Sequence, residues 1–182
     1  MADPGARLIQ RIAAGDRGAL AELYALHGSA LLRYLVQLSG DPELAQELLQ
    51  ETLLAIWRSA PSFEGRSTAR TWCFGIARRR LRDARRRPLH LDDPWPQDSE
   101  DLASPEISPE DAALERMEID QMARAVSELP ILQREVLTLI FVDGFTGPEA
   151  ASILNVPDGT VKSRLNAARR TLRARLRPGS DG

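Results

Sequence analysis

The stretch over residues 146–176 constrains the fold more than any other part of the chain. Its first four residues, Thr-Gly-Pro-Glu, have the composition of a capping box with proline in the first turn. They predict a short helix over residues 148–154, which Asn155 ends by adopting the left-handed conformation. Val156 and Pro157 then form a turn, and Asp158 is the predicted N-cap of a second helix. The pattern therefore predicts a helix-turn-helix.

The second helix of this motif separates apolar and polar side chains onto different faces. Its apolar face is predicted from spacings of four and three: Val161, Leu165, Ala168, Leu172 and Leu176. Another face carries amide and cationic groups at the same spacings: Lys162, Asn166, Arg169 and Arg173. Arginine and lysine suit guanine edges and phosphates, and asparagine suits adenine, so this helix is a candidate major-groove reader. A basic amphipathic helix is also common as a plain solvated face, and the pattern alone leaves both interpretations open.

Composition sets the fold class and the kind of DNA contact that is possible. The 182 residues suffice for one ordinary domain or two small ones. Aromatic residues make up only 5% of the chain, and abundant Ala, Leu, Arg and Glu predict an all-α protein. The formal net charge is −2, so DNA binding would have to come from local cationic clusters. Those clusters are made of arginine, because Lys162 is the only lysine.

The inventory of reactive side chains argues against an enzyme and against a metal or cofactor site. Cys73 is the only cysteine, and His27 and His90 lie far apart without ligand-spaced neighbours. We find neither a phosphate-cradling glycine loop nor a nucleophile with a matching base. The sequence shows no membrane-spanning run and no signal-peptide pattern, so a cytoplasmic location without membrane insertion is expected.

Three zones are predicted along the chain. Residues 8–87 form a three-helix domain, residues 88–109 a flexible acidic linker with five prolines, and residues 110–177 a four-helix domain that ends in the helix-turn-helix. In the first zone Asp16 is the predicted cap of a helix to about Leu38, and Gly40-Asp41-Pro42 ends it and starts the next. Ser67 is the predicted cap of a third helix over residues 68–87. The first of these helices is expected to bury Leu20, Leu23, Tyr24, Leu31 and Leu35.

In the third zone one helix is predicted over residues 110–128 and another over residues 131–143, which Gly144 ends. The second of these is expected to face the helix-turn-helix with Leu132, Val136, Leu139 and Ile140.

The third helix of the first zone ends in seven arginines, Arg78, Arg79, Arg80, Arg82, Arg85, Arg86 and Arg87. Cations in a last turn are favoured by the helix macrodipole, which explains the final three. Arg78 and Arg82 lie further inside the helix on one face, where their mutual repulsion costs stability. A polyanionic partner such as nucleic acid is the better explanation for these two.

Three motifs, in order along the chain, resemble the sigma factors of bacterial RNA polymerase, specifically the extracytoplasmic-function (ECF) group. The first is the sequence AQELLQE at residues 45–51, followed by Trp57. The second combines Phe63-Glu64-Gly65 with Thr71-Trp72, Ile76-Ala77-Arg78, Asp83 and Arg86. The third runs from Gly144 through Glu149 and Val156-Pro157 to Ala168-Arg169. The resemblance covers nearly the whole chain.

The resemblance implies a transcription initiation factor with three binding surfaces. The first zone corresponds to sigma region 2 and the third zone to sigma region 4. Core RNA polymerase would bind Glu47, Gln50, Glu51, Leu54 and Trp57. The −10 promoter element would be captured as an unpaired strand by Phe63, Glu64, Gly65, Arg66, Ser67, Arg78, Arg79 and Arg82. The −35 element would be read by Thr160, Lys162, Ser163, Asn166, Arg169 and Arg170.

The implied partners are therefore core polymerase, promoter DNA and an anti-sigma protein that holds the factor inactive. A sigma mimic, which sequesters the anti-sigma protein without binding promoter DNA, is the alternative. A mimic typically lacks the basic contacts, whereas this chain keeps Lys162, Arg169 and the arginine helix. A plain helix-turn-helix repressor is a third hypothesis, and it leaves the first two motifs unexplained.

Overall fold

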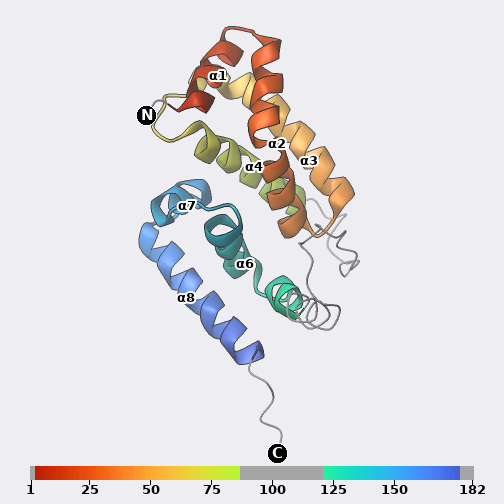
Figure 1. Ribbon diagram of the computed structural model, residues 1–182, viewed down its shortest axis with the longest axis vertical. Coiled ribbons are helices and arrows are strands. Elements are labelled where there is room, and N and C mark those ends of the chain that lie inside the picture. Colours follow the sequence, from red (N-terminus) through yellow and green to blue (C-terminus); the bar gives the residue numbers. More distant parts are fainter. Residues whose placement is uncertain (1–2, 87–120, 177–182) are drawn as a thin grey trace, which may run out of the picture.

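The structure, a computed structural model, describes residues 3–86 and 121–176, and both parts are helical (Figure 1). The N-terminal part contains α1 (Pro4–Ala13), α2 (Arg17–Ser39), α3 (Pro42–Ser59), the short 3-10 helix η1 (Ala60–Ser62) and α4 (Ala69–Arg85). The C-terminal part contains a helical stretch over residues 121–127, α6 (Ile131–Leu137), the π-helical turn η2 (Thr138–Val142), α7 (Gly147–Leu154) and α8 (Asp158–Arg175). The predicted linker over residues 88–109, Arg87 and the predicted helical residues 110–120 lie outside the described residues.

Helix α1 is an N-terminal α-helix that the sequence analysis did not predict. Asp3 caps it, because its Oδ1 accepts from the Gly5 amide at 2.9 Å, and Pro4 occupies the first turn. The other oxygen of the same carboxylate accepts from the Ala69 amide at 2.7 Å, at the start of α4. Ile9 and Ile12 are buried. One side chain thus joins the N-termini of two helices that are far apart in sequence.

Most of the predicted helix boundaries in this part are confirmed. Asp16 caps α2, Gly40 ends it with a φ of 81°, and Asp41 accepts from the next two free amides to cap α3. The predicted cap at Ser67 is wrong: Thr68 caps α4, its hydroxyl accepting from the Thr71 amide at 3.1 Å. Both residues have a hydroxyl group, so composition alone could not separate them.

The hydrophobic core between α2, α3 and α4 is built from apolar faces that the sequence largely predicted. Leu23, Leu31 and Leu35 are buried as expected. The prediction for Tyr24 is wrong, since 49% of it is exposed, and Tyr34 is the fully buried tyrosine of α2. Its ring packs against Phe74 of α4 with a centroid distance of 5.3 Å. A tyrosine side chain is compatible with both a buried and an exposed position, because it has an apolar ring and a polar hydroxyl group. Which tyrosine of α2 faces the core therefore depends on the side chains that pack against this helix.

The predicted helix-turn-helix is present at α7 and α8. The Thr146–Glu149 capping box forms, and Asn155 ends α7 with a φ of 49°. The prediction that Asp158 is the N-cap of α8 is wrong: Pro157 takes that position, without a side-chain hydrogen bond. Asp158 instead lies in the first turn and pairs with Lys162. A carboxylate is also favourable there because of the helix macrodipole.

The helix predicted over residues 131–143 forms as α6 followed by the π-helical turn η2, and Gly144 follows with a φ of 69°. Val136 and Leu139 are fully buried, as predicted. The prediction for Leu132 is wrong, because this side chain is 46% exposed. Leu132 lies in the first turn of α6, ahead of the π-helical turn, so the helical spacing that it shares with Val136 does not by itself bring it into the core.

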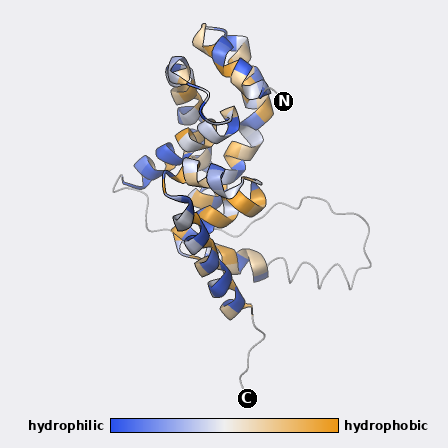
Figure 2. Cartoon of the chain, turned by 90° about the vertical axis from the view of Figure 1, so that its left-hand side faces the viewer, coloured by the Kyte–Doolittle hydropathy of each residue, from blue (hydrophilic) through white to orange (hydrophobic). Residues whose placement is uncertain are grey.

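The two described parts pack against each other. Helix α7 lies against α4, and α6 and η2 lie against α2 (Figure 1). One cluster of buried apolar side chains continues from the N-terminal helices into α6, α7 and the start of α8. The lower C-terminal helix in Figure 2 is rich in hydrophilic residues, in contrast to the apolar residues between the helices. The arrangement buries the contact between the two parts and leaves α8 at the surface.

Candidate nucleic-acid interface and protein-docking face

The candidate reader helix α8 presents its polar face to solvent. Lys162, Asn166, Arg169 and Arg170 are exposed, whereas Val161 and Ala168 on the other face are buried. Ser163 is exposed and its hydroxyl donates to the carbonyl oxygen of Thr160 at 3.0 Å. The predicted −35 residues therefore lie on one accessible strip, apart from Thr160, which is partly buried.

Two of the α8 cations that are predicted to contact DNA already have neighbours. The Lys162 ammonium lies 2.7 Å from the Asp158 carboxylate, and this hydrogen bond raises the pKa of the lysine, so it stays charged. The Arg169 guanidinium lies 5.6 Å from the centroid of Phe141, an aromatic side chain of the π-helical turn that is 59% exposed. Both contacts lie in solvent, where such pairs contribute little to stability. These groups are therefore available to a polyanion.

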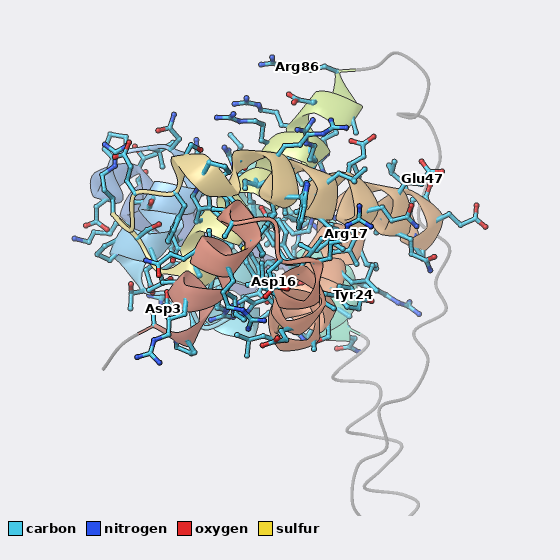
Figure 3. The ribbon with its side chains drawn as sticks, turned by 90° about the horizontal axis from the view of Figure 1, so that it is seen from above. Asp3, Asp16, Arg17, Tyr24, Glu47 and Arg86 are labelled. Atoms are coloured by element: carbon cyan, nitrogen blue, oxygen red, sulfur yellow. The ribbon has the colours of Figure 1, made fainter. Side chains whose placement is uncertain are left out.

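The second cationic surface is the arginine-rich end of α4. Arg79 and Arg82 are exposed, and Figure 3 shows Arg86 at the far end of the helix. Arg78 behaves differently: only 16% of its side chain is exposed, and its Nε donates to Glu135 of α6 at 2.8 Å. The prediction that a polyanionic partner best explains Arg78 is corrected here, because a carboxylate of the same chain compensates its charge.

The loop before α4 combines a fixed aromatic base with an exposed tip. The Phe63 ring packs on Trp72 of α4, with a centroid distance of 5.1 Å. Gly65 has a φ of 68°, a conformation that glycine adopts without strain. Glu64 and Arg66 form an exposed ion pair at 2.9 Å, and Ser67 is partly buried. The predicted −10 residues of this loop lie together around one turn, and the exposed arginines of α4 follow on the next helix.

The predicted protein-docking face on α3 is accessible. Glu47, Gln50 and Leu54 are exposed, and Leu54 has 54% of its surface in solvent. Figure 3 shows Glu47 pointing away from the helix. Glu51 and Trp57 are partly buried, and Trp57 packs against the core. The five residues form a ridge on one helix with acidic groups, an amide and one bare apolar side chain, a composition suited to a protein partner.

The contact between the two parts involves charged residues that the sequence analysis did not select. Glu135 is 6% exposed, and the Asp143 side chain is fully buried. Asp143 accepts from Arg33 at 3.1 Å, and its backbone carbonyl accepts from Arg70. The sequence did carry an indication of this contact, namely the acidic residues inside the apolar stretch over residues 131–143. A carboxylate at a core position requires a hydrogen-bonding or charged partner.

Burial shifts several pKa values around this contact. Desolvation raises the pKa of Asp143, and the hydrogen bond from Arg33 opposes that shift. Desolvation also raises the pKa of Tyr34 well above its ordinary value. Cys73, fully buried in α4, has its pKa raised to about 12 by the same cause. It is therefore a neutral core thiol and not a nucleophile.

Within the ranges 3–86 and 121–176, no three His, Cys, Asp or Glu side chains lie close enough to hold a metal ion. In that same part of the chain, no helix combines the length and the apolar composition needed to cross a membrane.

Comparison with known proteins agrees with the sequence motifs. The family "Sigma-70 region 2" matches residues 23–88, and "Sigma-70, region 4" matches residues 119–172. The ECF RNA polymerase sigma factor SigL of Mycobacterium tuberculosis is 35% identical over 169 residues, covering 90% of this chain and 92% of that protein. The RNA polymerase sigma factor NccH of Alcaligenes xylosoxydans xylosoxydans is 32% identical and covers 97% of each chain.

Solved structures show the same arrangement of helices. CnrH in complex with the cytosolic domain of CnrY is similar with a TM-score of 0.69 and 26% identity, covering 94% of this chain and 96% of that chain. The sigma factor RpoE of Bartonella quintana, in complex with the anti-sigma factor NepR, has a TM-score of 0.64 and 26% identity, covering 89% of this chain and 98% of that chain.

The fold and the two matched regions define a bacterial sigma factor. The chain belongs to the ECF group of the sigma-70 family.

Proposed function

We propose that this ECF sigma factor binds core RNA polymerase through the ridge on α3, captures the melted −10 strand with the loop before α4 and the exposed arginines of α4, and reads the −35 element with α8. The domain boundaries that go with this function are residues 8–87 and 110–177, joined by the acidic linker over residues 88–109. The activity is binding and positioning, and the chain contributes no catalytic group of its own.

The observation that carries the −35 assignment is the division of α8 into two faces. Val161 and Ala168 fix one face in the core, and the opposite face holds Lys162, Asn166 and Arg169 in solvent. Side chains at these spacings lie within about two helical turns, which matches the reach of a helix along the major groove. The preceding tight turn, held by Asn155 and Pro157, sets the angle between α7 and α8.

The −10 assignment rests on the loop and the cationic surface that follows it. Phe63 is anchored on Trp72, so the loop has a rigid base, while Glu64 and Arg66 at its tip are exposed. Arg79 and Arg82 extend a positive surface along α4, suited to the backbone of a single strand. Arg78 can contribute to this surface only when its ion pair with Glu135 is broken.

An anti-sigma protein is the proposed regulator. The similar solved structure of the sigma factor RpoE holds the anti-sigma factor NepR, and that of CnrH holds the cytosolic domain of CnrY. The exposed apolar side chains of this chain offer contact area for a protein partner, among them Leu54, Phe141 and Val142.

Run-off transcription with purified core polymerase on fragmented genomic DNA tests the proposal. We expect discrete new transcripts with this chain, and their loss when Lys162 and Arg169 are both replaced by alanine. Binding to core polymerase should survive that double substitution. Glu47→Lys with Glu51→Lys should instead abolish co-migration with core polymerase. A chain that binds an anti-sigma protein but yields no transcript on any template would be a sigma mimic.

A further inference from the structure

Asp3 differs from the aspartates that cap α2 and α3 in the helices that it connects. Asp16 and Asp41 accept from amides of the helices that they cap. The Asp3 carboxylate is shared: Oδ1 accepts from Gly5 of α1 at 2.9 Å, and Oδ2 accepts from Ala69 of α4 at 2.7 Å. The second of these bonds joins positions 66 residues apart. Asp3 therefore fixes the start of α4 relative to the start of α1.

The packing beside this carboxylate leaves no room for a side chain at Gly5. A Cβ atom there would lie 2.6 Å from the Cβ of Ala69, closer than two such atoms approach each other in real structures. Ala69 is completely buried, and so is Ile9, one turn further along α1. Glycine allows the two backbones to approach this closely because it has no Cβ. The hydrogen bond to Asp3 and the packing at Gly5 thus hold the same contact.

Helix α1 also supports the other end of the −10 loop, which we define as residues 63–67. It packs on η1, the turn that this loop follows, and Figure 1 shows the loop passing beside the N-terminal end of α1. Ala60 of η1 is buried, and its carbonyl oxygen accepts from the Phe63 amide at 3.1 Å. Holding both ends of a five-residue loop removes conformational freedom from it before any ligand binds.

The −10 loop holds the side chains to which we assign capture of the melted strand. Phe63 packs on Trp72, and Gly65 has a φ of 68°. Glu64 and Arg66 are exposed at the tip. A loop that is ordered before its ligand arrives loses less entropy on binding, so this order increases affinity. Helix α1 contains none of the residues assigned to DNA, and it precedes the residues matched to sigma region 2.

We propose that α1 and Asp3 form a support that sets the shape of the −10 loop, and that Asp3 is a positioning residue for capture of the −10 strand. This proposal rests on the function proposed above. Asp3 acts through the Ala69 amide and not through its charge. Charge and position predict opposite effects here. A carboxylate beside a DNA-binding surface repels phosphates, so its removal would strengthen DNA binding if charge alone acted. Loss of the support weakens it.

The test measures capture of a single strand by the full chain bound to core RNA polymerase. The probe is a fluorescein-labelled single-stranded oligonucleotide with the −10 sequence of a promoter found by the run-off experiment, and its anisotropy gives the affinity. Asp3→Ala should weaken binding of this probe about 10-fold. Binding to core polymerase through α3 and to a −35 duplex through α8 should not change. Unchanged or stronger binding of the probe overturns the proposal.

Asp16→Ala is the matched control. It also removes an aspartate N-cap from the N-terminal part, but the Asp16 carboxylate accepts from Ala19 of α2 and from Arg11, away from α4. Both substitutions should lower the midpoint of urea unfolding, because each removes a cap. Asp16→Ala should leave binding of the −10 probe unchanged. Equal losses of affinity in the two variants would reduce Asp3 to a contributor to stability and overturn its positioning role.

A second pair of variants keeps the Asp3 carboxylate and moves α1. Gly5→Ala places its Cβ against Ala69, so it should also weaken binding of the −10 probe. Adding Ala69→Gly removes the atom that the new Cβ meets, so the double variant should recover part of the lost affinity. Wild-type affinity in Gly5→Ala would contradict the proposal, because the contact between α1 and α4 would then be irrelevant to the loop.

Hydrogen exchange in the free chain separates this proposal from the proposed function. The amides of residues 63–71 should exchange about 10-fold faster in Asp3→Ala than in the wild-type chain. Unchanged exchange overturns the support of the loop by α1, whatever the chain binds. If the wild-type complex fails to bind the −10 probe, the proposed function is refuted, and faster exchange in Asp3→Ala still establishes the support.

Discussion

Helices α4 and α8 have similar compositions and opposite roles in the structure. Both are rich in arginine, and both pair an apolar face with a basic one. Helix α4 buries Phe74, Cys73 and Ala77 in the main core and directs Arg78 at another element. Helix α8 buries only Val161 and Ala168 completely and keeps its selected cations in solvent. A run of arginines therefore predicts nucleic-acid binding only where the neighbours leave the guanidinium groups free.

The largest expected difference is in the stability lost when an aromatic ring is removed, from within α4 in one case and from beside α8 in the other. Phe74→Ala should lower the free energy of unfolding by about 3 kcal/mol or more, because a fully buried ring is lost and a cavity remains. Phe141→Ala, next to Arg169 of α8, should cost less than about 1 kcal/mol, because that ring is 59% exposed. Urea unfolding of both variants measures the difference. Equal losses would contradict the placement of α4 in the core.

Two arginines of α4 should differ in their effect on the contact between the N-terminal and C-terminal parts. Arg78→Ala leaves the Glu135 carboxylate of α6 buried without its cation, which should weaken the contact between α4 and the C-terminal part. Because α7 packs on α4 at this contact, protection of the α7 amides from hydrogen exchange should fall at least ~10-fold. Arg82→Ala, at an exposed position, should leave that protection unchanged and weaken binding to a single-stranded −10 oligonucleotide. Hydrogen exchange followed by mass spectrometry measures the first effect. Identical exchange rates in the two variants would contradict a structural role for Arg78 that Arg82 lacks.

The exposed face of α8 should respond in DNA binding and not in folding. Lys162→Ala should weaken binding to a −35 duplex by about 10-fold and lower the salt dependence by about one counterion. Its ion pair with Asp158 lies in solvent, so the unfolding midpoint should stay the same. Ser152→Ala on α7, also exposed, is the matched control. A shifted midpoint with unchanged DNA affinity would assign Lys162 to structure alone.

The last comparison is a pH dependence carried by the inner face of α4, which has no effect on stability at neutral pH. Burial raises the pKa of Cys73 to about 12 from a reference value of 9.0, so the folded chain keeps a proton that the unfolded chain releases. Stability contributed by this group is present below pH 9 and is lost as the pH rises towards 12. Cys73→Ala should flatten this part of the stability profile. Alkylation of wild-type Cys73 at pH 8 should occur only on unfolding, and rapid labelling of the native chain would contradict its burial.

The local structure of the described residues follows from the amino-acid sequence. Capping residues, turn glycines and apolar periods act over a few residues, so Asp16, Gly40, Asp41, the capping box and Asn155 lie where they were predicted. Where two neighbouring side chains had the same chemistry, as at Ser67 and Thr68, the local pattern could not choose between them. The motifs in their order along the chain also identified the family before any contact was known.

Which charged groups remain free depends on how the helices pack. Arg78 and Arg82 lie on one face of α4, but Glu135 belongs to a helix more than fifty residues away and reaches only the first of them. Asp143 and Arg33 are separated further still in sequence. Long-range pairing depends on how whole helices pack, and helix packing follows from the combined shape of many side chains, which no local pattern contains.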